Sequence, residues 1–428
     1  MPQPLTIEQA GADLRAGKVS AVELAQESLR RIHEQQPRLN SFITITGDLA
    51  IEQARRADGE LARGIDRGPL HGIPYGLKDL FHVKGIRTTA GSRIFEHYVP
   101  GYDSTVYKKL TEAGAVLMGK TGLHELAYGI TSNNPHFGAI RNPHDVNRIP
   151  GGSSGGSGAA VVADLVFFAM GTDTGGSIRV PSAYCGCAGL KPTADLVSRY
   201  GLMPLSVTLD HAGPMARTAG DVALVMNALV PASMGKPSAR DFRVGVPENF
   251  FNEGLSAPVA KAYEAVIGRF KTVSVRVPDP AAINAAGRTI LFSEASAQLE
   301  PHMHNRESIG TDVLALLDQG RHVAAVEYIK ARRLRMYYQR AWEAVWEKCD
   351  VIFTPTAAIQ APLIGQEIVE GEEVRFASTK FVRPFNVLGL PALSVPLPVA
   401  GLPIGLQIIS PRGGDASVLS VALSPQLD

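Results

Sequence analysis

Short apolar runs that lead into glycine-rich turns dominate the first half of this sequence. Between Gly72 and Gly220 the chain is dense in Gly, Ser, Thr and Pro, and the runs at 115–118 and 165–170 each end in a glycine-containing turn. Runs of this length predict strands that are buried on both faces and that feed loops. Such strands need helices to cover them, so the pattern predicts an α/β architecture.

Helical patterns precede and separate these strands. Ser20 and Glu23 form a capping box that predicts a helix extending towards Gln36, and an Ala- and Glu-rich pattern predicts a second helix over 47–64. A long helical pattern covers 311–348 and is broken at Gly320. Further strands are expected at 242–246, 273–277, 351–354, 392–395 and 404–409. The alternation predicts a buried sheet with helices on both faces.

Composition and charge restrict the partners. The chain has 428 residues, of which 45% are hydrophobic and 19% are charged, as in soluble globular proteins. A net charge of +1 provides no basic field, so neither nucleic acid nor an anionic membrane surface is an expected partner. The N-terminal residues lack the apolar core of a signal peptide, and the apolar stretch 159–170 is too short to span a bilayer. We therefore expect a cytoplasmic protein.

Metal and cofactor motifs are weak. Cys185, Cys187 and Cys349 are too few for a disulfide framework, and a C-x-C pair without a second pair favours buried thiols over a metal site. The sequence contains no repeat and no clear linker. The best candidate boundary, Lys236–Arg240, is not treated as one. No metal and no cofactor are therefore expected.

Three glycine-dense segments each carry a serine or a lysine. They are Gly72–Asp79, Pro150–Gly158 and Gly171–Arg179. Glycines let the backbone approach a ligand closely, and consecutive N–H groups can form a concave site for an anion. That anion is either a phosphate or the oxyanion of an acyl-transfer intermediate.

Two familiar motifs fit these segments poorly. No lysine follows the glycines as a P-loop requires, and the dinucleotide pattern fails because Val161 stands at its sixth position. The nucleophile-elbow pattern G-x-S-x-G is matched with Ser154 at its centre. The residues before it, 147–151, do not form a convincing strand, which disfavours a Ser-His-Asp hydrolase.

Taken together, the three segments resemble the signature of the amidase signature family. The chain has G-G-S-S-G-G-S at 151–157, G-T-D-T-G-G-S-I-R at 171–179 and an upstream lysine in P-x-x-x-K-D. Ser177 follows Ser153 by 24 positions, and Ser153 follows Lys78 by 75, which is typical of the family. The resemblance continues through 218–221, 350–356 and 405–409 but is weak over 230–345. It implies one α/β/α unit around a large mixed sheet, a single domain over 1–428 with a signature core at about 70–220 and a variable, substrate-side segment at about 230–345.

The resemblance also assigns catalytic roles. Ser177 matches the nucleophile, Ser153 matches a relay serine that follows a cis peptide bond, and Lys78 matches the base, which must be neutral to accept a proton. No histidine is required. The backbone N–H groups implied for the oxyanion hole are those of Thr174, Gly175, Gly176 and Ser177.

Other residues are expected to support the catalytic group. Ser154 matches a structural neighbour, and Asp173 and Arg179 match residues that hold the loop. Asp79 either orients Lys78 or caps a turn. The family places a loop beside the acyl group, for which core packing is the alternative; here it comprises Ala127, Tyr128, Gly129 and Ile130.

The resemblance leaves two functions open. One is a hydrolase of a small amide, or of a related ester or carbamate, for which a homodimer is an open possibility. The other is the glutaminase-type component of a tRNA-dependent amidotransferase, known as its A subunit, which passes ammonia to a partner. The glycine- and acid-rich segment expected of such a component is not found, and 328–346 is basic and aromatic instead. A third possibility, an inactive binding module, is disfavoured by the intact triad.

The substrate and the C-terminal edge are less constrained. The apolar character of Tyr128, Ile130, Phe381 and Phe385 suggests an apolar or aromatic substrate without charge. The chain ends at Asp428, where family members usually continue into a longer helix. Either the end is truncated or a partner covers that edge.

Overall fold

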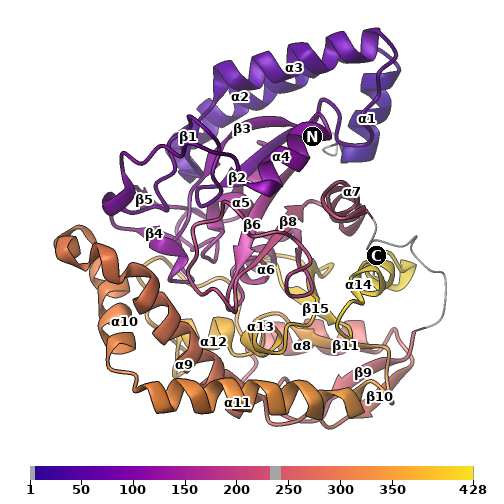
Figure 1. Ribbon diagram of the computed structural model, residues 1–428. Helices are drawn as coiled ribbons and strands as arrows, with labels where there is room; N and C mark the ends of the chain where they lie inside the picture. The colour runs from indigo at the N-terminus through magenta and orange to yellow at the C-terminus, as the bar shows by residue number, and fades with distance from the viewer. Residues whose placement is uncertain (1–4, 232–241, 428) are drawn as a thin grey trace.

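An eleven-stranded mixed sheet runs through the molecule in the computed structural model, which describes residues 5–231 and 242–427 (Figure 1). Helices cover both faces of this sheet, so the predicted α/β/α architecture is confirmed. The candidate boundary at Lys236–Arg240 lies outside the described residues.

The strand order mixes parallel and antiparallel pairs. Parallel pairing joins β2 to β3 and β6 on one side, and β9 to β10 and β11 on the other, whereas the strands between are antiparallel. From edge to edge the strands are β1 (Phe42–Ile45), β3 (Val116–Thr121), β2 (Pro74–Lys78), β6 (Phe168–Asp173), β8 (His211–Ala216), β7 (Ala188–Lys191), β14 (Ala392–Pro396), β15 (Gly405–Ile409), β11 (Val351–Pro355), β9 (Val244–Pro247) and β10 (Thr272–Val275). Two small ribbons pair β4 (Asn133–Asn134) with β5 (Gly138–Ala139) and β12 (Ile368–Val369) with β13 (Glu372–Glu373).

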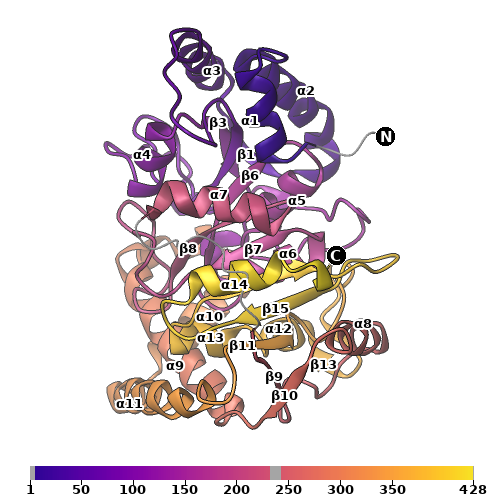
Figure 2. The same ribbon diagram turned by 90° about the vertical axis from the view of Figure 1, so that its right-hand side faces the viewer.

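The helices form layers around the sheet. Figure 2 shows α7 and α14 lying across one face, and Figure 1 shows α9, α10 and α11 together at one end of the molecule. The helices are α1 (Ile7–Arg15), α2 (Ala21–Leu39), α3 (Gly47–Ala62), α4 (Thr105–Glu112), α5 (Gly155–Val162), α6 (Arg179–Cys185), α7 (Ala219–Leu229), α8 (Ala257–Ile267), α9 (Pro280–Leu299), α10 (Thr311–Arg321), α11 (Ala325–Ala341), α12 (Val374–Thr379), α13 (Arg383–Leu388) and α14 (Asp415–Ala422). Among the described residues, no helix combines the length and the apolar character needed to cross a membrane.

Local sequence signals located several of these elements. The Ser20–Glu23 capping box begins α2 as predicted, and α3 occupies the second predicted helix. The long pattern after 310 does break, but Gly320 itself stays helical and α10 ends at Arg321. Near the C-terminal end, α14 packs against β14 and β15.

Strands rich in small residues were not predicted from the sequence. β8 has the sequence HAGPMA, which shows no apolar run, yet all six residues are buried. A Cβ on Gly213 would lie 2.1 Å from the carbonyl oxygen of Leu190 on β7. The glycine is therefore needed for close approach to the neighbouring strand, a requirement that arises only in the folded sheet.

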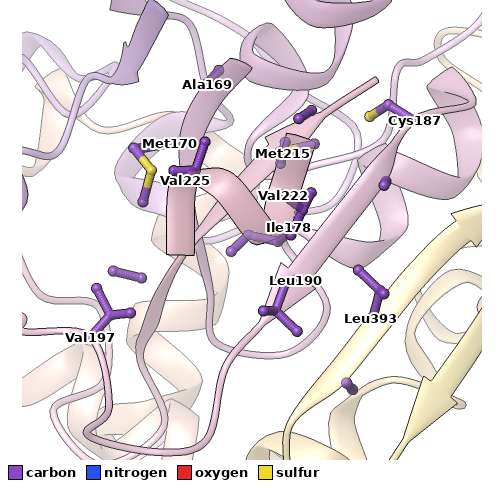
Figure 3. Close-up of a cluster of buried hydrophobic side chains, with 14 of the residues drawn as sticks. Ala169, Met170, Ile178, Cys187, Leu190, Val197, Met215, Val222, Val225 and Leu393 are labelled. Carbon is purple, nitrogen blue, oxygen red and sulfur yellow. The ribbon is translucent and has the colours of Figure 1, made fainter. Parts of the chain in front are cut away.

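Part of the apolar core lies around the central strands. Figure 3 shows Ile178, Leu190, Met215, Val222 and Leu393 gathered there from five different parts of the chain. Each of these side chains is fully buried. This core supports the strand ends at which the glycine-dense segments begin.

Truncation of this core should destabilise the protein measurably. We expect Leu190→Ala to lower the free energy of unfolding by about 2–5 kcal/mol, because it leaves a cavity between β7 and its neighbours. The matched control is Leu423→Ala, at a side chain that is 46% exposed. The measurement is the midpoint of chemical denaturation followed by circular dichroism. Equal midpoints for the two variants would contradict this account of the core.

Candidate active site

Two parallel strands bring the glycine-dense segments to one edge of the sheet. Lys78 is the last residue of β2, and Asp173 is the last residue of the adjacent β6. Because parallel strands end at the same edge, the loops that follow them converge there. The loop after β6 carries Ser177, and Ser153 stands just before α5, which packs against both strands.

The amine of Lys78 is held by three hydroxyl groups. Its Nζ lies 2.8 Å from Ser153 Oγ, 2.9 Å from Ser154 Oγ and 2.7 Å from Thr172 Oγ1. Full burial lowers the pKa of Lys78 to about 7, although the negative charges of Asp173 and Asp210 act in the opposite direction. Because a hydroxyl both donates and accepts, these three partners suit the ammonium form, which donates three hydrogen bonds, and also the neutral amine, which donates two and accepts one.

The two adjacent serines differ in their remaining contacts. Ser154 Oγ accepts the N–H of Thr172 and donates to the Thr172 carbonyl, each at a distance of 3.2 Å. These hydrogen bonds attach Ser154 to β6. The hydroxyl of Ser153 contacts only Lys78 within the described part of the chain. Ser153 follows a cis peptide bond from Gly152. This arrangement leaves the Ser153 proton available for transfer.

Ser177 lies beside this pair but is not hydrogen-bonded to it through its side chain. The Ser177 carbonyl accepts the N–H of Ser154 at a distance of 3.1 Å. Ser177 is 6% exposed. Its hydroxyl makes no hydrogen bond to any residue in 5–231 or 242–427. Hydrogen bonds of this type often tighten only when substrate is bound.

The loop before Ser177 presents backbone N–H groups. No acceptor within the described residues meets the N–H groups of Thr174, Gly175 and Ser177. The N–H of Gly176, in contrast, donates to Asp173 Oδ1 over 2.8 Å. Gly176 has φ +119°, and a Cβ there would lie 2.3 Å from the Val382 side chain. Of the four N–H groups predicted for the oxyanion hole, that of Gly176 is therefore engaged by Asp173, and the other three have no acceptor among the described residues.

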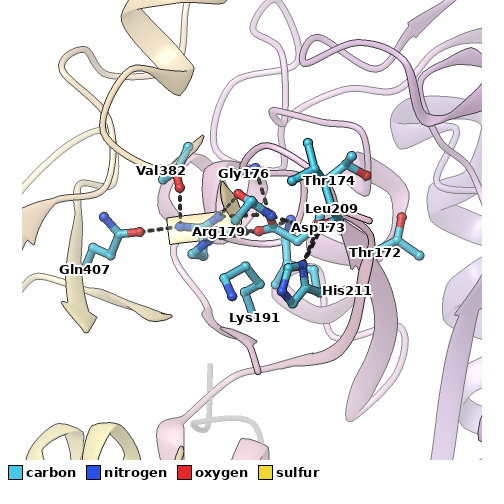
Figure 4. A network of polar contacts seen from close by, with 12 residues as sticks. Thr172, Asp173, Thr174, Gly176, Arg179, Lys191, Leu209, His211, Val382 and Gln407 are labelled. Carbon is cyan, nitrogen blue, oxygen red and sulfur yellow. Dashed lines mark hydrogen bonds and ion pairs between the residues drawn. The ribbon is translucent and has the colours of Figure 1, made fainter. Parts of the chain in front are cut away.

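A buried ion pair fixes this loop. Asp173 and Arg179 are both fully buried and meet in two parallel contacts of 2.9 Å (Figure 4). Arg179 also donates to the Val382 carbonyl, to Gln407 Oε1 and to Asn386 Oδ1. Burial alone would raise the pKa of Asp173, but the charge and hydrogen bonds of Arg179 hold it well below its usual value.

Asp79 does not orient Lys78. Its carboxylate forms a buried ion pair with Lys120 at 2.9 Å and accepts the N–H and the hydroxyl of Thr89. The second alternative, a role in the local turn, is the one that the contacts support.

A separate carboxylate, Asp210, accepts the hydroxyl of Thr174 at a distance of 2.6 Å and so supports the loop before Ser177.

The 127–130 segment wraps around the serine loop. His124 donates its N–H to the Ser153 carbonyl, and a Cβ on Gly152 would lie 2.9 Å from the backbone of Ile130. Ala127 has φ +58°, a left-handed conformation that is rare for a residue with a side chain and recurs at functional sites. Ile130 packs in a small apolar cluster, whereas Tyr128 lies under the guanidinium of Arg375 at 5.6 Å.

The expected apolar pocket is not formed by Phe381 and Phe385. Both are fully buried and pack against Phe251, with ring centroids 5.6 Å apart in each case. They belong to the core between α13 and its neighbours. The sequence could not separate core from pocket here, because both environments favour aromatic residues.

Several supporting residues were missed. Thr172 stands inside the third glycine-dense segment, but nothing in that segment indicates that its hydroxyl reaches Lys78. Asn386 and Gln407 lie more than 200 positions from the residues that they contact. A signal that could have been used was Arg383, a charged residue within the apolar stretch 381–390.

All three cysteines are free thiols and buried. Cys185 Sγ donates a hydrogen bond of 3.3 Å to the carbonyl of Pro150, at the start of the second glycine-dense segment. Within 5–231 and 242–427, no three His, Cys, Asp or Glu side chains are grouped as a metal site would require.

Comparison with known proteins gives a consistent family match. The family model described as Amidase matches residues 23–419. The A subunit of glutamyl-tRNA(Gln) amidotransferase from Geobacter sp. (strain M21) is 36% identical, over 98% of this chain and 96% of its own length. A crystal structure described as an amidase is 33% identical, covers 98% of each chain and has a TM-score of 0.93. The same amidotransferase component from Thermotoga maritima is 31% identical over 98% of this chain and 95% of its own, with a TM-score of 0.79.

Breaking the buried ion pair should be costly. We expect Arg179→Ala to lower the free energy of unfolding by about 3–5 kcal/mol, because it leaves the Asp173 carboxylate buried without its partner. The control is Arg306→Ala, which removes an exposed pair with Asp318 and should cost less than about 1 kcal/mol. Chemical denaturation of both variants gives the comparison. A loss below about 1 kcal/mol for Arg179→Ala would refute the structural role of the pair.

Proposed function

The chain belongs to the amidase signature family, and on this premise we propose that it hydrolyses the C–N bond of a small-molecule amide through an acyl-enzyme on Ser177. The observation that carries the proposal is the fully buried Lys78, whose pKa is lowered to about 7 and whose Nζ lies 2.8 Å from the otherwise free hydroxyl of Ser153. A base of this kind is able to accept a proton at neutral pH.

In the acylation step, Lys78 accepts the Ser153 proton while Ser153 accepts that of Ser177. The Ser177 oxygen then attacks the amide carbonyl carbon, and the N–H groups of Thr174, Gly175 and Ser177 stabilise the negative oxygen that develops. The proton returns from Lys78 through Ser153 to the amide nitrogen. The C–N bond then breaks, which releases ammonia or an amine and leaves an ester on Ser177.

Deacylation uses the same proton relay, with water as the nucleophile and Ser177 as the leaving group. A water molecule replaces the amine, and Lys78 with Ser153 removes its proton as it attacks the ester carbonyl. The new tetrahedral intermediate uses the same N–H groups, and its collapse returns the proton to Ser177 and releases the acid. A related ester or carbamate fits the same sequence of steps, because only the leaving atom differs.

The second candidate is the A subunit of a tRNA-dependent amidotransferase, in which ammonia released from glutamine goes to a partner. The 36% identity to the Geobacter protein over nearly the whole chain favours this candidate. The structure described as an amidase has a TM-score of 0.93, against 0.79 for the Thermotoga protein, and this supports an amide hydrolase. Both candidates use the same chemistry at Ser177.

Activity of the isolated chain separates the two candidates. A hydrolase should release ammonia from glutamine, asparagine or other small amides at a rate that a partner does not change. An amidotransferase component should act on glutamine, and its turnover should rise when the partner proteins and acceptor tRNA are added. The measurement is coupled detection of ammonia with and without these additions.

Covalent labelling tests the nucleophile. We expect a fluorophosphonate to add one equivalent of mass to the wild-type chain and none to Ser177→Ala, because only an activated hydroxyl reacts. Ser198→Ala, at an exposed position, is the control and should label like the wild type. Intact-mass spectrometry gives the readout. Labelling that persists in Ser177→Ala would place the nucleophile elsewhere.

The pH dependence tests the base. Lys78 must be neutral, so kcat/KM should increase as pH rises and reach half its plateau near pH 7, where the amine loses its proton. Lys78→Arg, which stays charged, should reduce kcat/KM by at least about 100-fold across the range. The profile is measured on a neutral amide so that the substrate does not titrate. A wild-type profile that is flat between about pH 5 and 9 would exclude this role for Lys78.

A further inference from the structure

Beside the oxyanion loop lies a group of cationic side chains without an acidic partner. Arg383 opens α13 and Arg375 lies on α12, and Arg288 on α9 is close enough to affect the pKa of both. The aromatic ring of Tyr128, from the segment that wraps around the serine loop, lies against this group. None of the proposed catalytic steps uses these residues.

Arg383 is placed directly against the residues that would bind the oxyanion. A Cβ on Gly175 would lie 3.5 Å from its Nε, and the preceding carbonyl, that of Val382, accepts a hydrogen bond from Arg179. Arg383 Nη2 donates to Thr379 Oγ1 at a distance of 2.8 Å. Arg383 Nε, in contrast, is buried and has no hydrogen-bond partner in the described residues. A buried guanidinium N–H without an acceptor carries a desolvation penalty that a ligand can remove.

Tyr128 presents a second unpaired donor in the same place. Its hydroxyl is buried and also lacks a partner among the described residues. The guanidinium of Arg375 lies over its ring at 5.6 Å. The unpaired hydroxyl of Tyr128 and the unpaired Nε of Arg383 therefore stand in one neighbourhood, with Arg375 beside both.

The charges in this neighbourhood are not balanced. Burial, followed by the positive charges of Arg375 and Arg288, lowers the pKa of Arg383 to about 10. No carboxylate in 5–231 or 242–427 forms an ion pair with any of the three guanidinium groups. Like charges held together without a counter-charge favour the binding of an anion.

The nearby acids are engaged elsewhere. Asp312 meets His124 at 3.0 Å, and Glu372 pairs with Lys380 at 2.8 Å. Glu373 affects the pKa of Arg375 but is exposed and forms no ion pair with it. Next to Gly175, Asp173 pairs with Arg179 and Asp210 accepts the Thr174 hydroxyl, so neither of these carboxylates is paired with the cluster.

We propose that Arg383, Arg375 and Tyr128 form a subsite for a carboxylate, so that the substrates are small amides that carry a free carboxylate near the scissile carbonyl. A planar carboxylate offers the paired acceptors that guanidinium groups bind most strongly, and it can also accept the Tyr128 hydroxyl. This assignment rests on the proposed function and specifies its substrate class. It replaces the expectation of an uncharged, apolar substrate.

The first experiment compares matched substrates on the wild-type protein. Succinamic acid is paired with 4-methylpentanamide, in which an isopropyl group replaces the carboxylate, and malonamic and glutaramic acids vary the spacing. We expect kcat/KM for the best acid to exceed that for its neutral analogue by about 10- to 100-fold, which is the usual range for hydrogen bonds to a charged group. Preference for the neutral amide would overturn the proposal.

Substitutions then locate the preference. Arg383→Gln and Arg375→Gln should each lower the ratio of kcat/KM between acid and neutral analogue by about 10-fold or more, mainly through KM. Tyr128→Phe keeps the ring and removes only the hydroxyl, so its ratio should fall less than that of either arginine variant. Arg306→Gln, at an exposed arginine remote in sequence from the site, is the matched control and should keep the wild-type ratio. An unchanged ratio in both arginine variants would overturn the assignment.

A binding measurement separates failure of this proposal from failure of the proposed function. Succinate, which has no amide, should bind wild-type protein and Ser177→Ala equally in calorimetry, and binding should weaken about 10-fold or more in Arg383→Gln. If succinate binds but Ser177 neither labels nor turns over any amide, the subsite stands and the acyl-enzyme proposal falls. If Ser177 labels and neutral amides react but no dicarboxylate binds, the subsite falls and the acyl-enzyme proposal stands.

Discussion

The buried ion pair between Asp173 and Arg179 is the interaction on which the site depends. The carboxylate accepts the N–H groups of Gly176, Ile178 and Arg179 together with the guanidinium, and Arg179 reaches across to Gln407 on β15. One pair thereby shapes the loop after β6 and attaches it to the C-terminal half of the sheet. Because both charged groups are surrounded by hydrogen-bond partners, the charges are tolerated at full burial.

The same dry environment explains why Lys78 is suited to act as a base. Lys78, Lys120 and Lys191 are all fully buried, and burial lowers the pKa of each. Lys120 has the carboxylate of Asp79 as a partner, and Lys191 donates to the Pro192 carbonyl. Lys78 meets only hydroxyl groups, which can exchange protons with it. The three lysines differ in their partners, and those of Lys78 include Ser153, the proposed relay to Ser177.

The sequence could predict features that depend on residues close together in the chain, but not features that depend on residues far apart. The capping box of α2 and the glycine-dense segments act through neighbours in the chain, so they were visible. β8 and the contacts of Arg179 with Asn386 and Gln407 arise from residues far apart in the chain, so they were not. Phe381 and Phe385 show the same limit, because an aromatic residue fits a core as well as a pocket. A single domain over 1–428 and a homodimer stay predictions.

The residues proposed for chemistry and those proposed for substrate selection occupy different parts of the chain. The proposed catalytic groups fall between Lys78 and Ser177, whereas Arg375 and Arg383 come from α12 and α13, and Tyr128 is the member of the proposed subsite that lies within the first range. A carboxylate subsite is compatible with both candidate functions, since glutamine carries a carboxylate as well as an amide. Substrate charge therefore does not separate the two candidates. They differ in the fate of the released ammonia, which in one case enters solvent and in the other must reach a partner, and this is why dependence of turnover on added partner proteins is the discriminating property.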